Sequence, residues 1–324
     1  TMIDPSAGGA AGVESLGCVS RRSCQDRRAM RCGSAVNPAP PRGGGVNRSR
    51  VSRGTGTVMA IALIFNKTRP DAIGIYFERA CRALGVAYDH WALFDVGQIP
   101  ATYDLYLRID HGDDYLTELP ARLRPAVFYA IDTHLPHSWR KIRQIAGQYD
   151  LVCCAQRDAA ARLPRAAWLP FACDPDLPGA CGTAPTWDVA FVGMDGGIPR
   201  KFYLQALRER YPNSSIGTAD HTKLGMIYSG ARIGFNYSIA DEVNMRMFEV
   251  LSAGTLLVTN RLSHDAFGAL GFQEGVHFAA YQGPRDLFDV IDACLSQDAR
   301  RERIAPQGMA FVRERHTDLP RLRQ

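Results

Sequence analysis

The chain of 324 residues has no long uninterrupted apolar stretch. A membrane-spanning helix needs roughly 20 consecutive apolar residues, and no segment approaches that length. The N-terminal residues also lack the apolar core of roughly 7–15 residues that defines a secretory signal peptide. We therefore expect no integral membrane span and a cytoplasmic location.

Cysteine patterns typical of metal or redox sites are missing as well. The sequence contains nine cysteines, but no C-x-x-C pair and no Cys/His cluster with zinc spacing. Cys153 and Cys154 lie inside an apolar run, which indicates buried thiols. We expect reduced cysteines, as in the cytosol, and no bound metal or cofactor. The acidic loop "HGDD" (111–114) leaves a divalent-cation site open, although such loops are usually only solvated.

A surplus of positive charge is absent from the part of the sequence that has a folding pattern. The net charge is +5, yet residues 1–58 contain nine arginines and three acids, which leaves the other 266 residues at −1. A nucleic-acid-binding surface would need that charge on the folded part. The sequence therefore predicts no nucleic-acid partner.

Residues 1–58 have the composition of a disordered leader. They are rich in Gly, Ser, Pro, Ala and Arg and show no apolar period. The start "TMIDPSAGGAAG" resembles vector-encoded sequence, and Met59 stands just before the first apolar run. We interpret residues 1–58 as vector- or upstream-derived, with a basic targeting arm as the other interpretation.

From Ala60 onward, short apolar runs alternate with segments of helical periodicity. Helices are expected at 71–85 (with Asp71 as N-cap and Gly85 as stop), 137–149, 157–163, 200–211, 223–231, 245–254, 284–297 and 298–316. Strands are expected at 60–66, 86–94, 103–110, 126–134, 151–156, 166–174, 187–193, 232–238 and 255–261. This alternation predicts an α/β fold with parallel sheets covered on both faces.

A segment dense in proline and glycine, "PDLPGACGTAPT" (175–186), interrupts the alternation and predicts a linker. We therefore expect two tandem Rossmann-like domains, residues 59–174 and 187–324. Ligands of such open sheets bind at the carboxyl ends of the strands. The predicted site is accordingly a cleft between the two domains.

The segment "DEVNMRMFEVLSAGTLLVTNR" (241–261) follows the strand expected at 232–238. A carboxylate there, such as Glu249, can accept hydrogen bonds from two ribose hydroxyls, and free N–H groups at a helix start favour a phosphate. Gly254 allows the chain to turn before a buried strand. The simpler interpretation is that Arg246 and Glu249 form an exposed i,i+3 ion pair.

At this stretch the sequence "NMRMFEVLSAGTLLVTN" resembles the signature of the group-one, GT-B-type glycosyltransferases, most of all their CgeB-like (spore-maturation-type) branch. Segments with the same likeness follow in the same order, namely "FYAIDTHLPHSW", "YDLVCCAQRD", "WLPFACDPDLP", "DVAFVG" and "IAPQGMAFVRERHT". The resemblance implies two Rossmann-like domains facing across a cleft. It also implies a nucleoside diphosphate sugar donor in the C-terminal domain, an acceptor in the N-terminal domain, and transfer without a metal.

The resemblance also assigns donor-binding residues. Glu249 matches the acid that holds the donor ribose, and Asp241 stands where the family places the first acid of an E-x7-E pair, with Asp in place of Glu. Arg200 and Lys201 match the basic pair that meets the pyrophosphate, since they follow the glycine-bearing loop "GMDGGIP" (193–199). The other donor-site candidates are Gly193, Asn244, Arg246, Gly254 and Thr255.

Two polar loops could supply a general base for the acceptor hydroxyl. Asp110, His111, Asp113 and Asp114 follow one expected strand, while Asp132 and His134 follow another. A histidine is tuned near neutral pH and suits this role, although loop histidines more often make structural bonds. The catalytic candidates are Asp110, His111, Asp132, His134 and Asp241.

The predicted function is transfer of a sugar from a nucleoside diphosphate sugar to an acceptor hydroxyl, on a glycan or small molecule that the sequence does not identify. The same scaffold also supports phosphorolysis, epimerisation or glycoside hydrolysis. Hydrolysis would need two carboxylates about 5–10 Å apart, drawn from Asp110, Asp113, Asp132, Asp241 and Glu249. A non-catalytic nucleotide- or sugar-binding protein is the third hypothesis. The sequence stops at "HTDLPRLRQ" (316–324), soon after the last expected helix begins its final turn, so the family's C-terminal crossing helix is expected to be missing or abbreviated.

Overall fold

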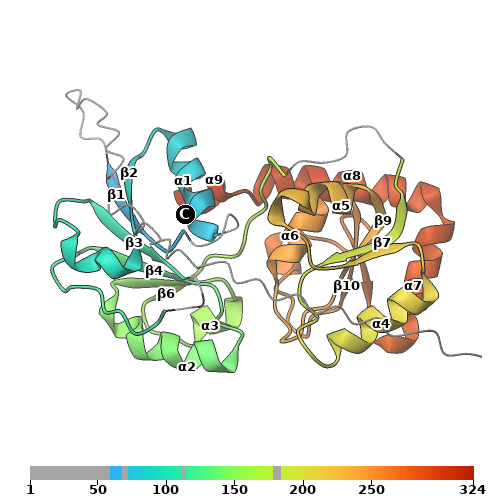
Figure 1. The fold of residues 1–324 in the computed structure, drawn as a ribbon, viewed down its shortest axis with the longest axis horizontal. Helices are drawn as coiled ribbons and strands as arrows, with labels where there is room; N and C mark the ends of the chain where they lie inside the picture. Colours follow the sequence, from blue (N-terminus) through green and yellow to red (C-terminus); the bar gives the residue numbers. More distant parts are fainter. Residues whose placement is uncertain (1–58, 68–71, 111, 113, 178–183) are drawn as a thin grey trace, which may run out of the picture. The chain divides into compact units, whose positions relative to one another are not determined.

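The computed structural model describes residues 59–67, 72–110, 112, 114–177 and 184–324, which all belong to one compact unit of the chain. Two parallel β-sheets, each with its own helices, make up this part (Figure 1). The predicted fold class, α/β with parallel sheets, is confirmed. The division into domains at residues 174 and 187 remains a prediction.

The first sheet has six strands in the order β2-β1-β3-β4-β5-β6. Every neighbouring pair is parallel. Its strands are β1 (Ala60–Ile64), β2 (Ala87–Trp91), β3 (Leu105–Ile109), β4 (Ala126–Ala130), β5 (Leu151–Cys154) and β6 (Ala166–Trp168). The helical segments are α1 (Ile73–Leu84), η1 (Leu93–Gln98), α2 (Pro136–Ile145), η2 (Ala146–Gln148) and α3 (Arg157–Ala161).

One glycine ends α1, and another allows the helix to pack closely against the sheet. Gly85 ends the helix with φ of 68°, as predicted for the stop. Gly74 allows close approach, because a Cβ there would lie 2.4 Å from the ring of Phe65, just beyond β1. The predicted N-cap Asp71 lies outside the described residues, and the helix begins after Ala72 without a side-chain cap.

The second sheet has five parallel strands in the order β11-β10-β9-β7-β8. Its strands are β7 (Trp187–Val192), β8 (Ser214–Gly217), β9 (Ala231–Asn236), β10 (Leu256–Asn260) and β11 (Ala279–Tyr281). The helical segments are α4 (Arg200–Arg210), η3 (His221–Lys223), α5 (Leu224–Ser229), α6 (Met245–Ser252), η4 (Gly268–Leu270), α7 (Pro284–Ser296) and α8 (Asp298–Arg315).

Both faces of the second sheet are buried, as the near-continuous apolar strands predict. On β7, Val189 and Phe191 belong to one apolar cluster while Ala190 and Val192 belong to another. Gly234 on β9 lets α6 approach closely, because a Cβ there would lie 2.3 Å from a methyl group of Val250. The strands β8 and β11 were not predicted, since "SSIG" is polar and "AAY" has only three residues.

A short C-terminal helix, α9 (Asp318–Arg323), packs against α1 of the first sheet. Six residues of helix therefore follow His316 and Thr317 and return to the first sheet. The backbone N–H of Cys173 donates to the carbonyl of His316 at 2.7 Å, just before α9 begins. Among the helices of the described residues, none is both long and apolar enough to cross a membrane.

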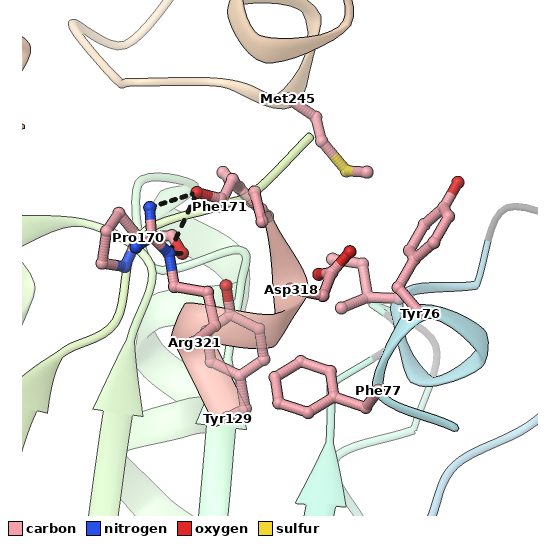
Figure 2. A pocket seen from close by; sticks show the side chains of 10 residues that line it. Tyr76, Phe77, Tyr129, Pro170, Phe171, Met245, Asp318 and Arg321 are labelled. Carbon is pink, nitrogen blue, oxygen red and sulfur yellow. Dashed lines mark hydrogen bonds between the residues drawn. The ribbon is translucent and has the colours of Figure 1, made fainter. Parts of the chain in front are cut away.

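Arg321 anchors α9 to the segment after β6 (Figure 2). Its guanidinium donates to the carbonyl oxygens of Pro170 at 2.9 Å and Phe171 at 3.1 Å. It also donates to Nδ1 of His316 at 2.8 Å. Since a guanidinium can only donate, His316 keeps its proton on Nε2, which donates to the carbonyl of Leu270 at 3.0 Å.

Asp318 lies beside Arg321 at a cavity of about 10 Å³, lined also by aromatic side chains of α1 and β4 (Figure 2). Such a space has room for about one water molecule. Burial, and then the charge of Asp174, raises the pKa of Asp318 to about 7. The folded protein therefore holds a proton on Asp318 at pH values where the unfolded chain has lost it.

Replacing Arg321 by Met should lower the free energy of unfolding by about 2 kcal/mol, because buried acceptors lose their donor. Urea denaturation measures the change. Arg323→Met is the matched control, since Arg323 is exposed on the same helix. Equal effects of the two substitutions would mean that the Arg321 bonds do not hold α9.

Asp318→Asn should make stability less dependent on pH. An acid whose folded pKa is raised loses stability as pH rises from the unfolded value, about 4, to the folded value, about 7. The variant should therefore gain stability relative to the native chain at pH 8 compared with pH 5. Urea denaturation at both pH values tests this, and a difference between variant and native chain that is independent of pH would contradict it.

Candidate functional site

A cavity of about 350 Å³ opens at the carboxyl ends of β7, β8 and β9. Parallel strands point their carboxyl ends to one edge of a sheet, so the loops that follow them meet there. We name this space the C-terminal cavity. Its lining residues are Val192, Gly193, Arg200, Ala219, His221, Leu224, Glu242, Asn244, Met245, Arg246 and Glu249.

Arg246, on the first turn of α6, is held by acceptors of the sheet. Its Nε donates to the carbonyl of Val192 at 2.9 Å, and a terminal nitrogen donates to Oδ1 of Asn236 at 3.1 Å. The guanidinium carbon lies 4.2 Å from the ring centroid of Phe191. Gly193 leaves space for this arrangement, because a Cβ there would lie 2.3 Å from the guanidinium.

Arg200, at the start of α4, reaches the same place from another element. Its Nε donates to the carbonyl of Tyr237 at 3.2 Å, and a terminal nitrogen donates to the carbonyl of Met194 at 3.2 Å. Only 8% of the residue is exposed. Burial, and then the charge of Arg246, lowers the pKa of Arg200 to about 10. The Arg200 guanidinium therefore remains charged at neutral pH.

Two like charges next to each other in a partly buried place are unfavourable unless anions compensate them. Neutral carbonyl and amide oxygens supply the four hydrogen bonds just described. Glu242 lines the cavity too and is only 5% exposed, and its charge acts on Arg200. The cavity wall thus holds two cations, Arg200 and Arg246, and two acids, Glu242 and Glu249. The guanidinium groups suit an anionic part of a ligand, and the carboxylates suit a part that carries hydrogen-bond donors.

Asn244 and Glu242 form the rim of the cavity at the start of α6. Asn244 is the N-cap, and its side chain accepts from the N–H of Met247 at 3.4 Å. Its amide also donates to Glu242 Oε1 at 3.2 Å, while Glu242 Oε2 accepts from the N–H of Ala240 at 2.8 Å. The cap thereby fixes the orientation of the acid beside the two arginines.

Glu249 lines the C-terminal cavity, as does Arg246 one turn earlier on α6. Neither side chain is exposed. An exposed surface pair, the simpler interpretation of their spacing, therefore does not describe them. The helix α6 ends at Ser252, and Gly254, with φ of 76°, turns the chain before β10 as predicted.

Asp241 does not line the cavity, although the spacing to Glu249 predicted that it would. Its φ of 60° turns the chain there, and its carboxylate accepts from both the N–H and the hydroxyl of Ser263. His264 lies 3.7 Å from the same carboxylate. The next residue, Glu242, lines the cavity instead. The sequence signal for it was present in "DEVN", but the register of a loop cannot be read from spacing alone.

Three other donor-site candidates lie apart from the lining residues. Lys201 is exposed, so only Arg200 of the basic pair reaches the cavity, and Arg246 is the second cation. Gly254 and Thr255 connect α6 to β10. The hydroxyl of Thr255 donates to the carbonyl of Tyr228 at 2.5 Å, which is a structural bond. His221 lines the cavity and was missed, because it follows the unpredicted strand β8.

In the first sheet, Asp110 follows β3 and is occupied by donors of the protein. Its carboxylate accepts from the hydroxyl of Tyr115 at 2.9 Å and from the N–H groups of Gly112 at 2.9 Å and Ile131 at 3.1 Å. The residue is 5% exposed. These bonds make Asp110 a scaffold for the loops after β3 and β4. His111 and Asp113 lie outside the described residues.

Asp132 and His134 follow β4 directly, as predicted, and lead into α2. Asp132 is half-buried and lies beside Gly112, where a Cβ would come 2.8 Å from its carboxylate. The buried Nδ1 of His134 and the hydroxyl of Thr133 have no hydrogen-bond partner within the described ranges. Across those ranges, no group of three or more His, Cys, Asp or Glu side chains is placed to hold a metal ion.

A family model described as "Glycosyl transferase-like" matches residues 183–324. This stretch contains the whole second sheet and all residues that line the C-terminal cavity. A search of curated proteins gave no match.

Several solved structures have a similar fold, and the alignment with this chain spans nearly the whole length of each. HepE from Anabaena, in complex with UDP and glucose, has a TM-score of 0.60 at 12% identity, covering 82% of this chain and 98% of HepE. Sucrose-phosphate synthase from Thermosynechococcus elongatus has 0.58 at 12%, covering 82% and 97%. BGT of phage T4, in complex with its UDP-glucose substrate, has 0.51 at 12%, covering 79% and 95%.

At such identities the likeness establishes the fold, and the family model adds the type of domain. The two parallel sheets of the described residues agree with this likeness of fold. The chain has the GT-B fold of these proteins, and its residues 183–324 match the glycosyl transferase-like family model.

Proposed function

We propose that this glycosyltransferase moves a sugar from a nucleoside diphosphate sugar, held in the C-terminal cavity, to an acceptor hydroxyl. The observation that carries the proposal is the pair of guanidinium groups, Arg200 and Arg246, on the wall of that cavity. In the reaction the acceptor oxygen bonds to the anomeric carbon while the bond to the diphosphate breaks. The diphosphate leaves with the electron pair, and fixed cations stabilise that developing charge.

Glu249 is proposed to bind the donor ribose, since a carboxylate accepts hydrogen bonds from two vicinal hydroxyls. The free N–H groups at the start of α6 favour the diphosphate. In this scheme the two guanidinium groups supply the positive charge that a metal ion would otherwise give, so transfer requires no metal. UDP is the first nucleotide to test, because HepE and BGT are complexed with UDP or UDP-glucose.

Asp132 and His134 are proposed to serve the acceptor, with one of them taking the proton from its hydroxyl. Their place after β4 is at the carboxyl edge of the first sheet, where ligands of such sheets bind. Hydrolysis is less favoured, because two of the carboxylates it would use are committed elsewhere. Asp110 is held by Tyr115 and Gly112, and Asp241 by Ser263.

We also infer a division into an acceptor domain (59–174), a linker (175–186) and a donor domain (187–324), and membership of the CgeB-like branch. The branch rests on the sequence likeness around "NMRMFEVLSAGTLLVTN". A cytoplasmic location fits the cysteines of the described residues, which are all free.

Arg200→Met should weaken UDP binding about 10- to 100-fold, because charge-assisted bonds to phosphate are lost. The affinity for uridine should stay unchanged. Isothermal titration of the native chain and the variant measures both. Lys201→Met, the neighbouring exposed cation, is the control and should bind UDP like the native chain. If the native chain binds no nucleoside diphosphate at all, the proposed function is wrong.

Glu249→Gln should lower the affinity for uridine and for UDP by the same factor, about tenfold, because both ligands carry the ribose. Asp241→Asn is the matched control, since that carboxylate is engaged with Ser263 outside the cavity. The same titrations test it. If Asp241→Asn loses affinity and Glu249→Gln does not, then Asp241, and not Glu249, binds the ribose.

A further inference from the structure

One hydrogen bond connects α1 of the first sheet to the wall of the C-terminal cavity. The hydroxyl of Tyr76 lies 2.8 Å from Nε2 of His221. The two rings meet edge to face, with 6.1 Å between their centroids. His221 lines the C-terminal cavity, whereas Tyr76 lines the small cavity beside α9 (Figure 2) and is 3% exposed.

The surroundings of Tyr76 keep its hydroxyl protonated. Burial, and then the carboxylates of Asp174, Glu249 and Asp318, raises the pKa of the Tyr76 hydroxyl. The hydroxyl keeps its proton and can donate it to Nε2 of His221, and in that arrangement a neutral His221 carries its own proton on Nδ1. No described residue hydrogen-bonds to that Nδ1.

Tyr76 is itself fixed from the first sheet. The guanidinium carbon of Arg79, one turn later on α1, lies 5.5 Å from the Tyr76 ring centroid. Arg79 pairs with Asp174 at 2.8 Å, and Asp174 is 7% exposed. A donor held this firmly restricts the ring of His221 more than a mobile surface residue could.

A second contact brings the first sheet to the same cavity. The side-chain amide of Gln156, just before α3, donates to the carbonyl of Val243 at 3.0 Å and accepts from its N–H at 3.1 Å. Val243 lies between two lining residues, Glu242 and Asn244. Side chains from α1 and from the start of α3 therefore both shape the rim of the C-terminal cavity.

We propose that Tyr76 is a positioning residue of the donor site, holding His221 so that its Nδ1–H donates to the nucleoside part of the nucleotide. The inference rests on the proposed function. The nucleoside part is favoured because the charge of Glu249, the proposed ribose ligand, acts on Tyr76, and because the diphosphate already has Arg200 and Arg246. The donor site is thus incomplete without α1.

The test is isothermal titration of the full chain with UDP and with uridine. Tyr76→Phe should lower the affinity for both ligands by the same factor, about 3- to 10-fold, as expected for one hydrogen bond. Tyr88→Phe is the matched control: Tyr88 is a half-buried tyrosine near Arg82 that lines neither cavity. It should bind like the native chain. Native-like affinity in Tyr76→Phe would overturn the inference.

A double-mutant cycle separates positioning from a general loss of structure. His221→Gln places its amide near the Nε2 position and should lose affinity, whereas His221→Asn keeps a donor near the Nδ1 position and should retain more. In the His221→Gln background, Tyr76→Phe should have no further effect. Additive losses would overturn the inference, as would equal losses in the two His221 variants. If the native chain binds UDP in these titrations, the proposed function stands whatever the outcome for Tyr76.

Discussion

Two guanidinium groups, those of Arg246 and Arg200, lie over one aromatic ring, Phe191, with their carbons 4.2 and 5.9 Å from its centroid. Backbone carbonyls after β7 and β9 hold them there. This arrangement restricts which residues can stand at nearby positions. Gly193 and Gly196 lie where a Cβ would reach within 2.3 and 3.0 Å of one guanidinium or the other. The protein thus keeps two cations in place at a cost in desolvation that a bound anion would offset.

The fold was predictable because its signal is repeated along the sequence from Ala60 onward. Most buried parallel strands are short apolar runs, and most helices show apolar residues at helical spacing. An error in one segment therefore does not alter the predicted α/β fold class. The strands that escaped prediction are β8 and β11, at the two edges of their sheet. An edge strand has one neighbour, and its residues need less apolar character to pair.

The candidate site was only partly predictable, because side-chain direction depends on loops. Glu249 and Arg246 lie on a regular helix, and the sequence located both at the cavity. Asp241 precedes that helix in a turn with positive φ, so the adjacent Glu242 faces inward instead. In the same way Arg200 is 8% exposed while its neighbour Lys201 is exposed. Neighbours on a helix differ by about 100° in direction, which sequence spacing cannot resolve without knowing the packing face.

The return of α9 to α1 has a consequence for how the molecule can be taken apart. The structural unit around the first sheet consists of two stretches that are distant in sequence, residues 60–168 and the helix Asp318–Arg323. A fragment that ends after β6 would lack α9, which packs against α1, and would expose apolar side chains such as Phe77. Recombination between relatives that exchanges only the N-terminal portion would pair α1 with a foreign final helix. Chimeras of this scaffold should therefore exchange both stretches together, as one discontinuous module.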